Sequence, residues 1–166
     1  MTLNYFENEI SKSLAEISKR KRGFFYFRLF DTRTFRQISE RIYALKQPCD
    51  FIALYQGKIY FLELKSSRNK TSFGYRYIKP HQFASLLKAE QAGARSYFLI
   101  CNRHKPRHYK CYAVKASVLS KEFNRSERAS IRWERLEQIS LLIPRIKLPS
   151  SSSGHLGWDL ELLFKA

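Results

Sequence analysis

Residues 48–65 read PCDFIALYQGKIYFLELK and contain two apolar segments separated by Gln56-Gly57. The segments Asp50–Tyr55 and Lys58–Lys65 are rich in β-branched and aromatic residues, which favours strands. A two-residue connection that contains glycine is typical of a tight β-hairpin. Both faces of this hairpin are largely apolar, so the sequence predicts an antiparallel strand pair in the interior of a sheet.

The two-residue turn sets the register of the hairpin. If Tyr55 pairs with Lys58, Asp50 falls opposite Glu63, and the bases of opposed side chains lie about 4.5–5.5 Å apart. Lys65 follows Glu63 by two residues, so strand alternation puts it on the same face. Two facing carboxylates beside an apolar core repel one another, and their uncompensated burial costs free energy. A divalent cation resolves this conflict, and oxygen ligands favour Mg²⁺, with Mn²⁺ as a substitute, over zinc.

A structural role for the same residues stays open at this point. Lys65 could bridge the two acids at the end of the sheet, because buried ion networks occur without any catalytic function.

The flanking sequence alternates between helical and strand patterns. Apolar residues at helical spacing predict an amphipathic helix over residues 3–18, and Pro80 predicts the start of a second helix that ends at Gly93. We expect further strands at 24–30, 95–101 and 109–115, a short helix at 116–123, and irregular basic segments at 31–47 and 66–79. This order predicts an α/β fold with a single mixed central β-sheet flanked by helices.

The C-terminal end has a different composition. Residues 149–154, PSSSSG, are typical of a flexible connector, and the apolar segment GWDLELLFKA follows at 157–166. We therefore expect one domain over residues 1–145, and a connector and tail over residues 146–166 whose apolar side chains dock on the core.

The strong positive charge of the chain indicates what kind of molecule it binds. The 166 residues include 31 Lys and Arg against 14 Asp and Glu, a formal net charge of +17. Such an excess is commonly neutralised by nucleic acid, although a ribosomal-type protein, a membrane-surface binder or a merely solvated basic surface has the same composition. Residues 64–121 contain 13 basic side chains and a single acid, Glu90.

Cysteine content and hydrophobicity argue against a disulfide-rich protein and a membrane-spanning protein. The three cysteines are an odd number and do not suggest a disulfide framework, and no apolar stretch reaches the roughly 18 residues that span a bilayer. Cys101, His104, His108 and Cys111 resemble a zinc arrangement, but their spacing is not that of common zinc modules. We expect a cytoplasmic protein without a membrane partner or a small-molecule cofactor.

The hairpin motif resembles that of a known superfamily. Pro48-Cys49-Asp50, followed by Glu63-Leu64-Lys65, is similar to the motif of PD-(D/E)xK nucleases. The loop Arg68–Phe73 and the pair His81-Gln82 resemble RecU-type Holliday junction resolvases, whose (D/E)xK strand is followed by an NKTSF-like loop and an HQ helix. The similarity covers about residues 50–101, and it implies a restriction-endonuclease-like core.

The resemblance also implies roles for individual residues. Asp50 and Glu63 would bind Mg²⁺. Lys65 would position or activate the attacking water and stabilise the charge that develops on the phosphate. Gln82 matches a helix glutamine that lies beside the active site of the family.

The first helix of the family supplies a further acid. Glu7 matches it best, because it follows Phe6 as the family acid follows an apolar residue, and Glu9 is the competitor. Either acid is otherwise an ordinary solvated charge on a helix. Residues 31–47 look shorter than the stalk that the family carries there, and the N-terminus lacks the basic arm of the family.

Basic side chains near these motifs are expected to contact the DNA backbone and to give register rather than sequence specificity. The first group interleaves with Phe73, Tyr75 and Tyr77, and the second precedes the hairpin. The two groups are Arg68, Lys70, Arg76 and Lys79, and then Arg33 and Arg36.

The sequence thus predicts a Mg²⁺-dependent, structure-selective endonuclease. The favoured substrate is a four-way junction in recombination and repair, cut by paired nicks. Such a junction has two-fold symmetry, so a homodimer with two active sites suits it. The alternatives are a nuclease that acts on linear or flapped duplex DNA in repair or restriction, and a non-catalytic basic DNA-binding module.

Overall fold

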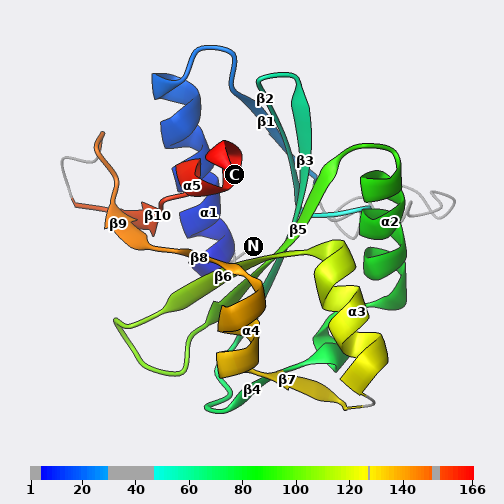
Figure 1. The fold of residues 1–166 in the computed structure, drawn as a ribbon. Coiled ribbons are helices and arrows are strands. Elements are labelled where there is room, and N and C mark those ends of the chain that lie inside the picture. Colours follow the sequence, from blue (N-terminus) through cyan, green and yellow to red (C-terminus); the bar gives the residue numbers. More distant parts are fainter. Residues whose placement is uncertain (1–4, 30–46, 127, 151–153) are drawn as a thin grey trace, which may run out of the picture.

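The computed structural model describes residues 5–29, 47–126, 128–150 and 154–166. At its centre is a six-stranded sheet in the order β1-β2-β3-β5-β6-β8 (Figure 1). Strands β3 and β5 are parallel, and the other neighbours are antiparallel. The predicted α/β fold with a mixed central sheet is confirmed. The strands are β1 (Phe25–Arg28), β2 (Phe51–Tyr55), β3 (Lys58–Ser67), β5 (Arg95–Asn102), β6 (Lys110–Lys115) and β8 (Leu141–Ile143).

The β2–β3 hairpin has the predicted register. Gln56 and Gly57 have φ angles of 48° and 71°, and positive φ at both turn positions suits the right-handed twist of the two strands. Strand β2 begins one residue later than expected, but the Asp50 N–H still donates to the Leu62 carbonyl at 3.1 Å. The paired residues end at Phe51 and Leu62, and Asp50 lies just beyond them, where its side chain accepts the N–H of Leu64.

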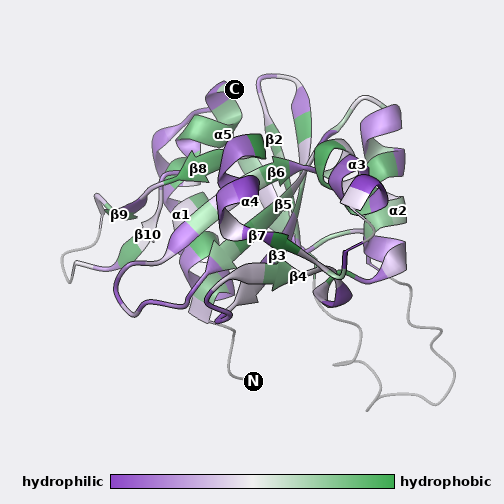
Figure 2. Cartoon of the chain, turned by 60° about the horizontal axis from the view of Figure 1, so that its bottom comes forward, coloured by the Kyte–Doolittle hydropathy of each residue, from purple (hydrophilic) through white to green (hydrophobic). Residues whose placement is uncertain are grey.

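Helices cover both faces of the sheet. Helices α1 (Tyr5–Arg20) and α5 (Glu161–Lys165) pack on one face, and α2 (Pro80–Gln91), α3 (Ala116–Ser126) and α4 (Trp133–Ile139) pack on the other (Figure 1). Each face has its own cluster of buried apolar side chains. Hydrophobic residues follow the strands and the inner sides of the helices, and hydrophilic residues lie outside (Figure 2). The hairpin thus runs between two apolar layers.

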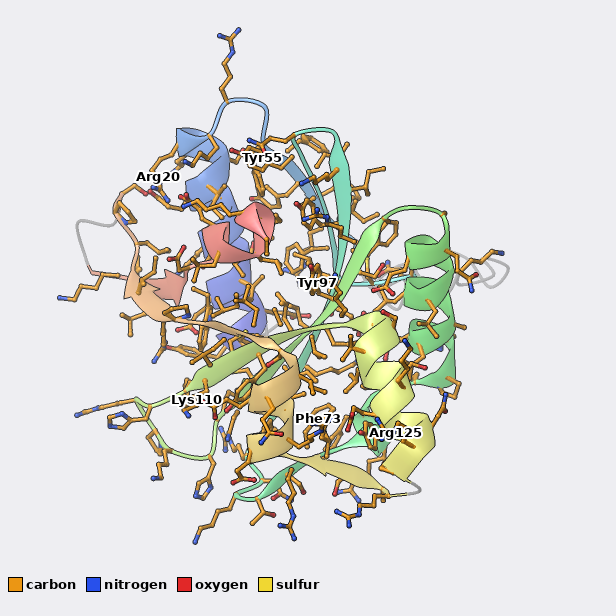
Figure 3. The ribbon with its side chains drawn as sticks, in the orientation of Figure 1. Arg20, Tyr55, Phe73, Tyr97, Lys110 and Arg125 are labelled. Carbon is orange, nitrogen blue, oxygen red and sulfur yellow. The ribbon has the colours of Figure 1, made fainter. Side chains whose placement is uncertain are left out.

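The prediction of an irregular segment at residues 66–79 is wrong. This segment is not an irregular loop, because β3 runs to Ser67 and is followed by strand β4 (Ser72–Gly74) and a 3-10 turn, η2 (Tyr75–Tyr77). Strand β4 pairs with β7 (Ser130–Arg132), which draws Phe73 into the core between α3 and α4 (Figure 3). Phe73 and Tyr75 are only 0% and 4% exposed, so neither belongs to a DNA-facing surface.

The C-terminal residues complete the core on the α1 side. Strand β9 (Arg145–Lys147) pairs with β10 (Leu156–Trp158). Trp158 and Phe164 are buried, and the ring of Phe164 meets Tyr60 edge-on at 4.8 Å between centroids. The division of the chain at residue 145 stays a prediction. No helix in the described ranges is long and apolar enough to cross a membrane.

Candidate active site

Strand β3 carries the central acid and base of the site. In the parallel register with β5, Glu63 pairs with Phe98 and Lys65 pairs with Ile100. Both partners are fully buried in the cluster on the α2 side, and Glu63 itself is 2% exposed. The sheet therefore places an ionisable carboxylate in apolar surroundings, where a charge is costly unless it is compensated.

Two donors share one oxygen of Glu63. Lys65 Nζ lies 2.8 Å from Oε1, and Gln82 Nε2 donates to the same oxygen. Gln82 comes from the first turn of α2, where its own Oε1 accepts the N–H of Lys79 at 3.0 Å. That capping contact fixes which way the amide points, because it directs the NH₂ group toward Glu63. Within the described part of the chain, Glu63 Oε2 accepts no hydrogen bond.

Asp50 approaches from the start of β2. Its Oδ2 accepts the backbone N–H of Leu64 at 2.7 Å, and its Oδ1 has no hydrogen-bond partner among the described residues. The neighbouring Cys49 is buried, and its thiol donates to the Phe51 carbonyl at 3.2 Å. Burial, aided by the charge of Glu63, raises the pKa of this thiol to about 12. Cys49 thus stays neutral and adds no further negative charge.

The environment favours the neutral form of both acids. Burial is the main cause that raises the pKa of Glu63 to about 7; the charge of Asp50 adds to the shift and Lys65 opposes it. Burial likewise raises the pKa of Asp50, against the Leu64 N–H and Lys65, which lower it. One lysine therefore does not compensate the pair of carboxylates fully.

These residues fit a hard divalent cation. Mg²⁺ commonly binds through one or two carboxylates and completes its shell with water and phosphate oxygens. Asp50 Oδ1 and Glu63 Oε2 are suitable ligand atoms, because the other oxygen of each carboxylate is held by donors of the protein. Among the described residues, no group of three or more His, Cys, Asp or Glu side chains could hold a metal.

The two acids of α1 lie in different surroundings. Glu7 accepts a hydrogen bond from Arg28 at 3.3 Å, and its charge raises the pKa of both strand carboxylates. Glu9 is instead ion-paired with Arg145 and accepts the indole N–H of Trp158 at 3.0 Å. The geometry therefore brings Glu7, and not Glu9, within electrostatic reach of the site.

The structure describes only some of the basic residues that were predicted to contact DNA. Four of the six basic residues are exposed, and Arg76 lies over the ring of Tyr77 with 5.2 Å to its centroid. The other two, Arg33 and Arg36, lie outside the described residues, as does most of the basic segment 31–47. The four exposed residues are Arg68, Lys70, Arg76 and Lys79.

Two groups that contact the acids of the site were not predicted from the sequence. The backbone N–H of Leu64 orients Asp50, and no pattern of side chains marks a backbone donor. Arg28 links Glu7 to the end of β1, where its guanidinium lies 5.8 Å from the ring centroid of Phe51. Its place as the one charged residue within the predicted strand 24–30 was the signal that could have identified it.

The sheet and its charged residues are typical of one group of nucleases. An acid at the start of one hairpin strand and a Glu-x-Lys on the next, in a mixed sheet between helices, form the arrangement of PD-(D/E)xK nucleases. The model of the RecU family, described as "Recombination protein U", matches residues 2–150. The chain therefore belongs to the RecU family, and the resemblance noted in the sequence is confirmed.

The chain is also similar to solved structures. One is that of Hjc from Archaeoglobus fulgidus, described as a Holliday junction resolvase from an archaeal hyperthermophile. The two share 18% identity, with 82% of this chain and 92% of that chain covered and a TM-score of 0.47. A search of the curated proteins found no match.

Proposed function

We propose that this protein is a metal-dependent endodeoxyribonuclease that resolves four-way DNA junctions as a homodimer in recombination and repair. The observation that carries the proposal is the pair formed by Asp50 and Glu63, each held by one oxygen with the other left for a ligand, beside the ammonium of Lys65. Membership of the RecU family supports a nuclease acting on recombination intermediates.

The residues have distinct tasks in this proposal. Asp50 and Glu63 would hold Mg²⁺ or Mn²⁺, which when bound supplies Lewis-acid stabilisation of phosphate charge and a more acidic water. Lys65 is fixed by its ion pair at 2.8 Å from Glu63, and its charge stabilises the developing phosphorane and orients the attacking water. Gln82 keeps Glu63 in one orientation, and Glu7 adds negative charge at the cation side of the site.

Substrate choice follows from symmetry and charge. A four-way junction needs two coordinated nicks, and a two-fold pair of subunits presents two equivalent sites. The net charge of +17 per chain attracts the phosphates of several arms and makes affinity strongly dependent on salt.

The test compares substrates and metals in one assay. The protein is incubated with a labelled four-way junction, linear duplex, flapped duplex or single strand, in EDTA, Mg²⁺ or Mn²⁺. We expect symmetric nicks in the junction only when the metal is present, and none with Asp50→Asn. Glu137→Gln removes an exposed carboxylate that pairs with Lys110, and it should cut normally as the matched control.

The other outcomes separate the alternatives. Equal cutting of linear duplex would favour a repair or restriction nuclease, and tight binding without cutting in either metal would favour a non-catalytic DNA-binding module. Sedimentation equilibrium should give about twice the chain mass of 19.7 kDa. A monomer would contradict the proposed dimer.

A further inference from the structure

A polar hollow of about 710 Å³ lies beside the β4–β7 ribbon. Its lining contains no apolar side chain, unlike the lining of most small-molecule pockets. Three cations contribute to it from separate parts of the chain: Lys70 precedes β4, Arg128 precedes β7, and Arg132 ends β7. The composition points to an extended anion rather than to an apolar ligand.

The pairing of the ribbon explains why polar groups gather on one side. Phe73 pairs with Ile131, and both side chains are buried in the core. Ser72 pairs with Arg132 one position along, so alternation turns both of them to the opposite face. Ser130 lies on that outward face too, and with Ser72 and Thr71 it gives the lining three hydroxyl groups.

The loop that forms one wall is anchored. Asn69 Oδ1 accepts the N–H of Thr71 at 2.9 Å and its hydroxyl at 3.2 Å. The buried Trp133 donates its indole N–H to the Asn69 carbonyl at 3.0 Å, and its backbone N–H to the Thr71 carbonyl at 3.2 Å. Lys70 and Thr71 are therefore presented by a fixed backbone, which lowers the entropy cost of binding.

The charge of the hollow is largely uncompensated. Other arginines of the molecule are ion-paired, such as Arg135 with Glu122. By contrast, none of the three cations of the hollow forms an ion pair with a described residue, and the only carboxylate in its lining is that of Glu134. The lining thus has a net charge of +2, from three cations and one anion. Hydroxyls and guanidinium groups together suit phosphodiester oxygens.

We infer that the hollow at the β4–β7 ribbon binds backbone phosphates of a DNA arm near the scissile phosphate. The inference rests on the proposed function, because it takes DNA as the substrate. Lys70 follows Lys65 by five residues, and five residues span at most about 17 Å. Since phosphates are spaced about 3.4 Å along the axis for each strand, a phosphate held by Lys70 lies within several nucleotides of the cut.

The test measures binding without cleavage. Arg128→Ala/Arg132→Ala is compared with Arg22→Ala/Lys58→Ala, which removes two exposed charges, one between α1 and β1 and one at the start of β3. The α1–β1 connection and the β2–β3 turn lie at the opposite end of the molecule from β4 and β7 (Figure 1). In EDTA, with a labelled junction, we expect the first pair to bind roughly tenfold more weakly, and its plot of log affinity against log salt to be less steep by about 2. The control pair should retain most of the affinity and nearly the full slope.

Two further variants test the sign of the effect. Glu134→Gln should tighten binding, because it removes the only carboxylate of the lining, and Arg132→Lys should recover most of the affinity that Arg132→Ala loses. Circular dichroism and thermal melts check that each variant is folded.

The result is independent of the nuclease proposal. Equal losses in the two double variants, or weaker binding by Glu134→Gln, would overturn the phosphate site whether or not the protein cuts DNA. Failure of the wild type to cut any substrate in Mg²⁺ or Mn²⁺ would instead count against the proposed function, and the binding comparison would still stand.

Discussion

Two buried glutamates on opposite faces of the sheet have opposite surroundings. Glu9 in α1 is 5% exposed, and both of its oxygens have partners, Arg145 on one and the Trp158 indole on the other. Glu63 in β3 is 2% exposed, but Lys65 and Gln82 share a single oxygen. The charge of a second carboxylate, Asp50, raises the pKa of Glu63.

The difference shows how a structural acid can be told from a candidate ligand. Burial alone does not separate them, because both side chains are almost inaccessible. Full hydrogen bonding and one matched cation make Glu9 part of the fold. An open oxygen and a like-charged neighbour leave Glu63 in need of a cation. Four predictions test this distinction between the two glutamates.

The largest effect is expected on catalysis. Asp50→Asn and Glu63→Gln should each slow cleavage by roughly 10³-fold or more, because several kcal/mol of transition-state stabilisation depends on the bound metal. Glu9→Gln should cut at nearly the normal rate per folded molecule. Single-turnover cleavage of a labelled junction at saturating protein measures this. Normal cutting by Glu63→Gln would refute the assignment of the site.

For the stability of the fold, we expect the larger effect from Glu9→Gln and the smaller effect from Glu63→Gln. Glu9→Gln leaves the mostly buried Arg145 guanidinium without its only carboxylate among the described residues, so we expect a loss of about 3 kcal/mol in the free energy of unfolding. Glu63→Gln should cost much less in EDTA, because it removes repulsion with Asp50. Urea unfolding followed by fluorescence compares the two variants. Equal losses would mean that Glu63 is as structural as Glu9.

The pH dependence of stability isolates Glu63. Its pKa is about 7 in the folded protein, against an ordinary value of 4.5, so the folded state retains a proton that the unfolded chain releases. The contribution is fully present below pH 4.5 and is lost as the pH rises through 7, with a total of roughly 3 kcal/mol. Thermal melts in EDTA from pH 4.5 to 8 should show this decline, and Glu63→Gln should remove most of it.

The smallest effect is expected at Gln82. Gln82→Ala removes the donor that orients Glu63, and metal affinity should fall by about tenfold, as is usual for groups that position a ligand. The same change removes a helix cap and should cost about 1 kcal/mol. Gln82→Glu keeps an acceptor for the Lys79 N–H, so it should restore the cap without restoring metal affinity. Mg²⁺ titrations of cleavage rate, together with urea unfolding, separate the two roles.

The centre of the site could be predicted from a short window. The turn at Gln56-Gly57 sets the register of β2 on β3, which brings Asp50 beside the Glu63–Lys65 segment, and no information from outside residues 48–65 was needed for this. The position of Gln82 came from the family resemblance, and its hydrogen bond to Glu63 depends on how α2 packs on the sheet.

Other parts could not be predicted in this way. Phe73 and Tyr75 were assigned to a DNA-facing surface, yet they are buried because β4 pairs with β7, and that partner is more than fifty residues away in the sequence. Strand β7 and helix α4 were not predicted at all. The spacing of Trp133, Leu136 and Ile139 was a helical signal that could have revealed α4.

The hairpin and its register follow from residues 48–65 alone, because backbone ladders and side-chain alternation are local and strictly periodic. Which α1 acid lies near the site, and which basic residues share the hollow beside β4 and β7, depends on contacts between segments that are far apart in the sequence. Those relations depend on the layers that α1, α4 and the C-terminal residues form on the sheet. Packing between distant segments is set by the shape and burial of whole surfaces, which no short stretch of residues encodes.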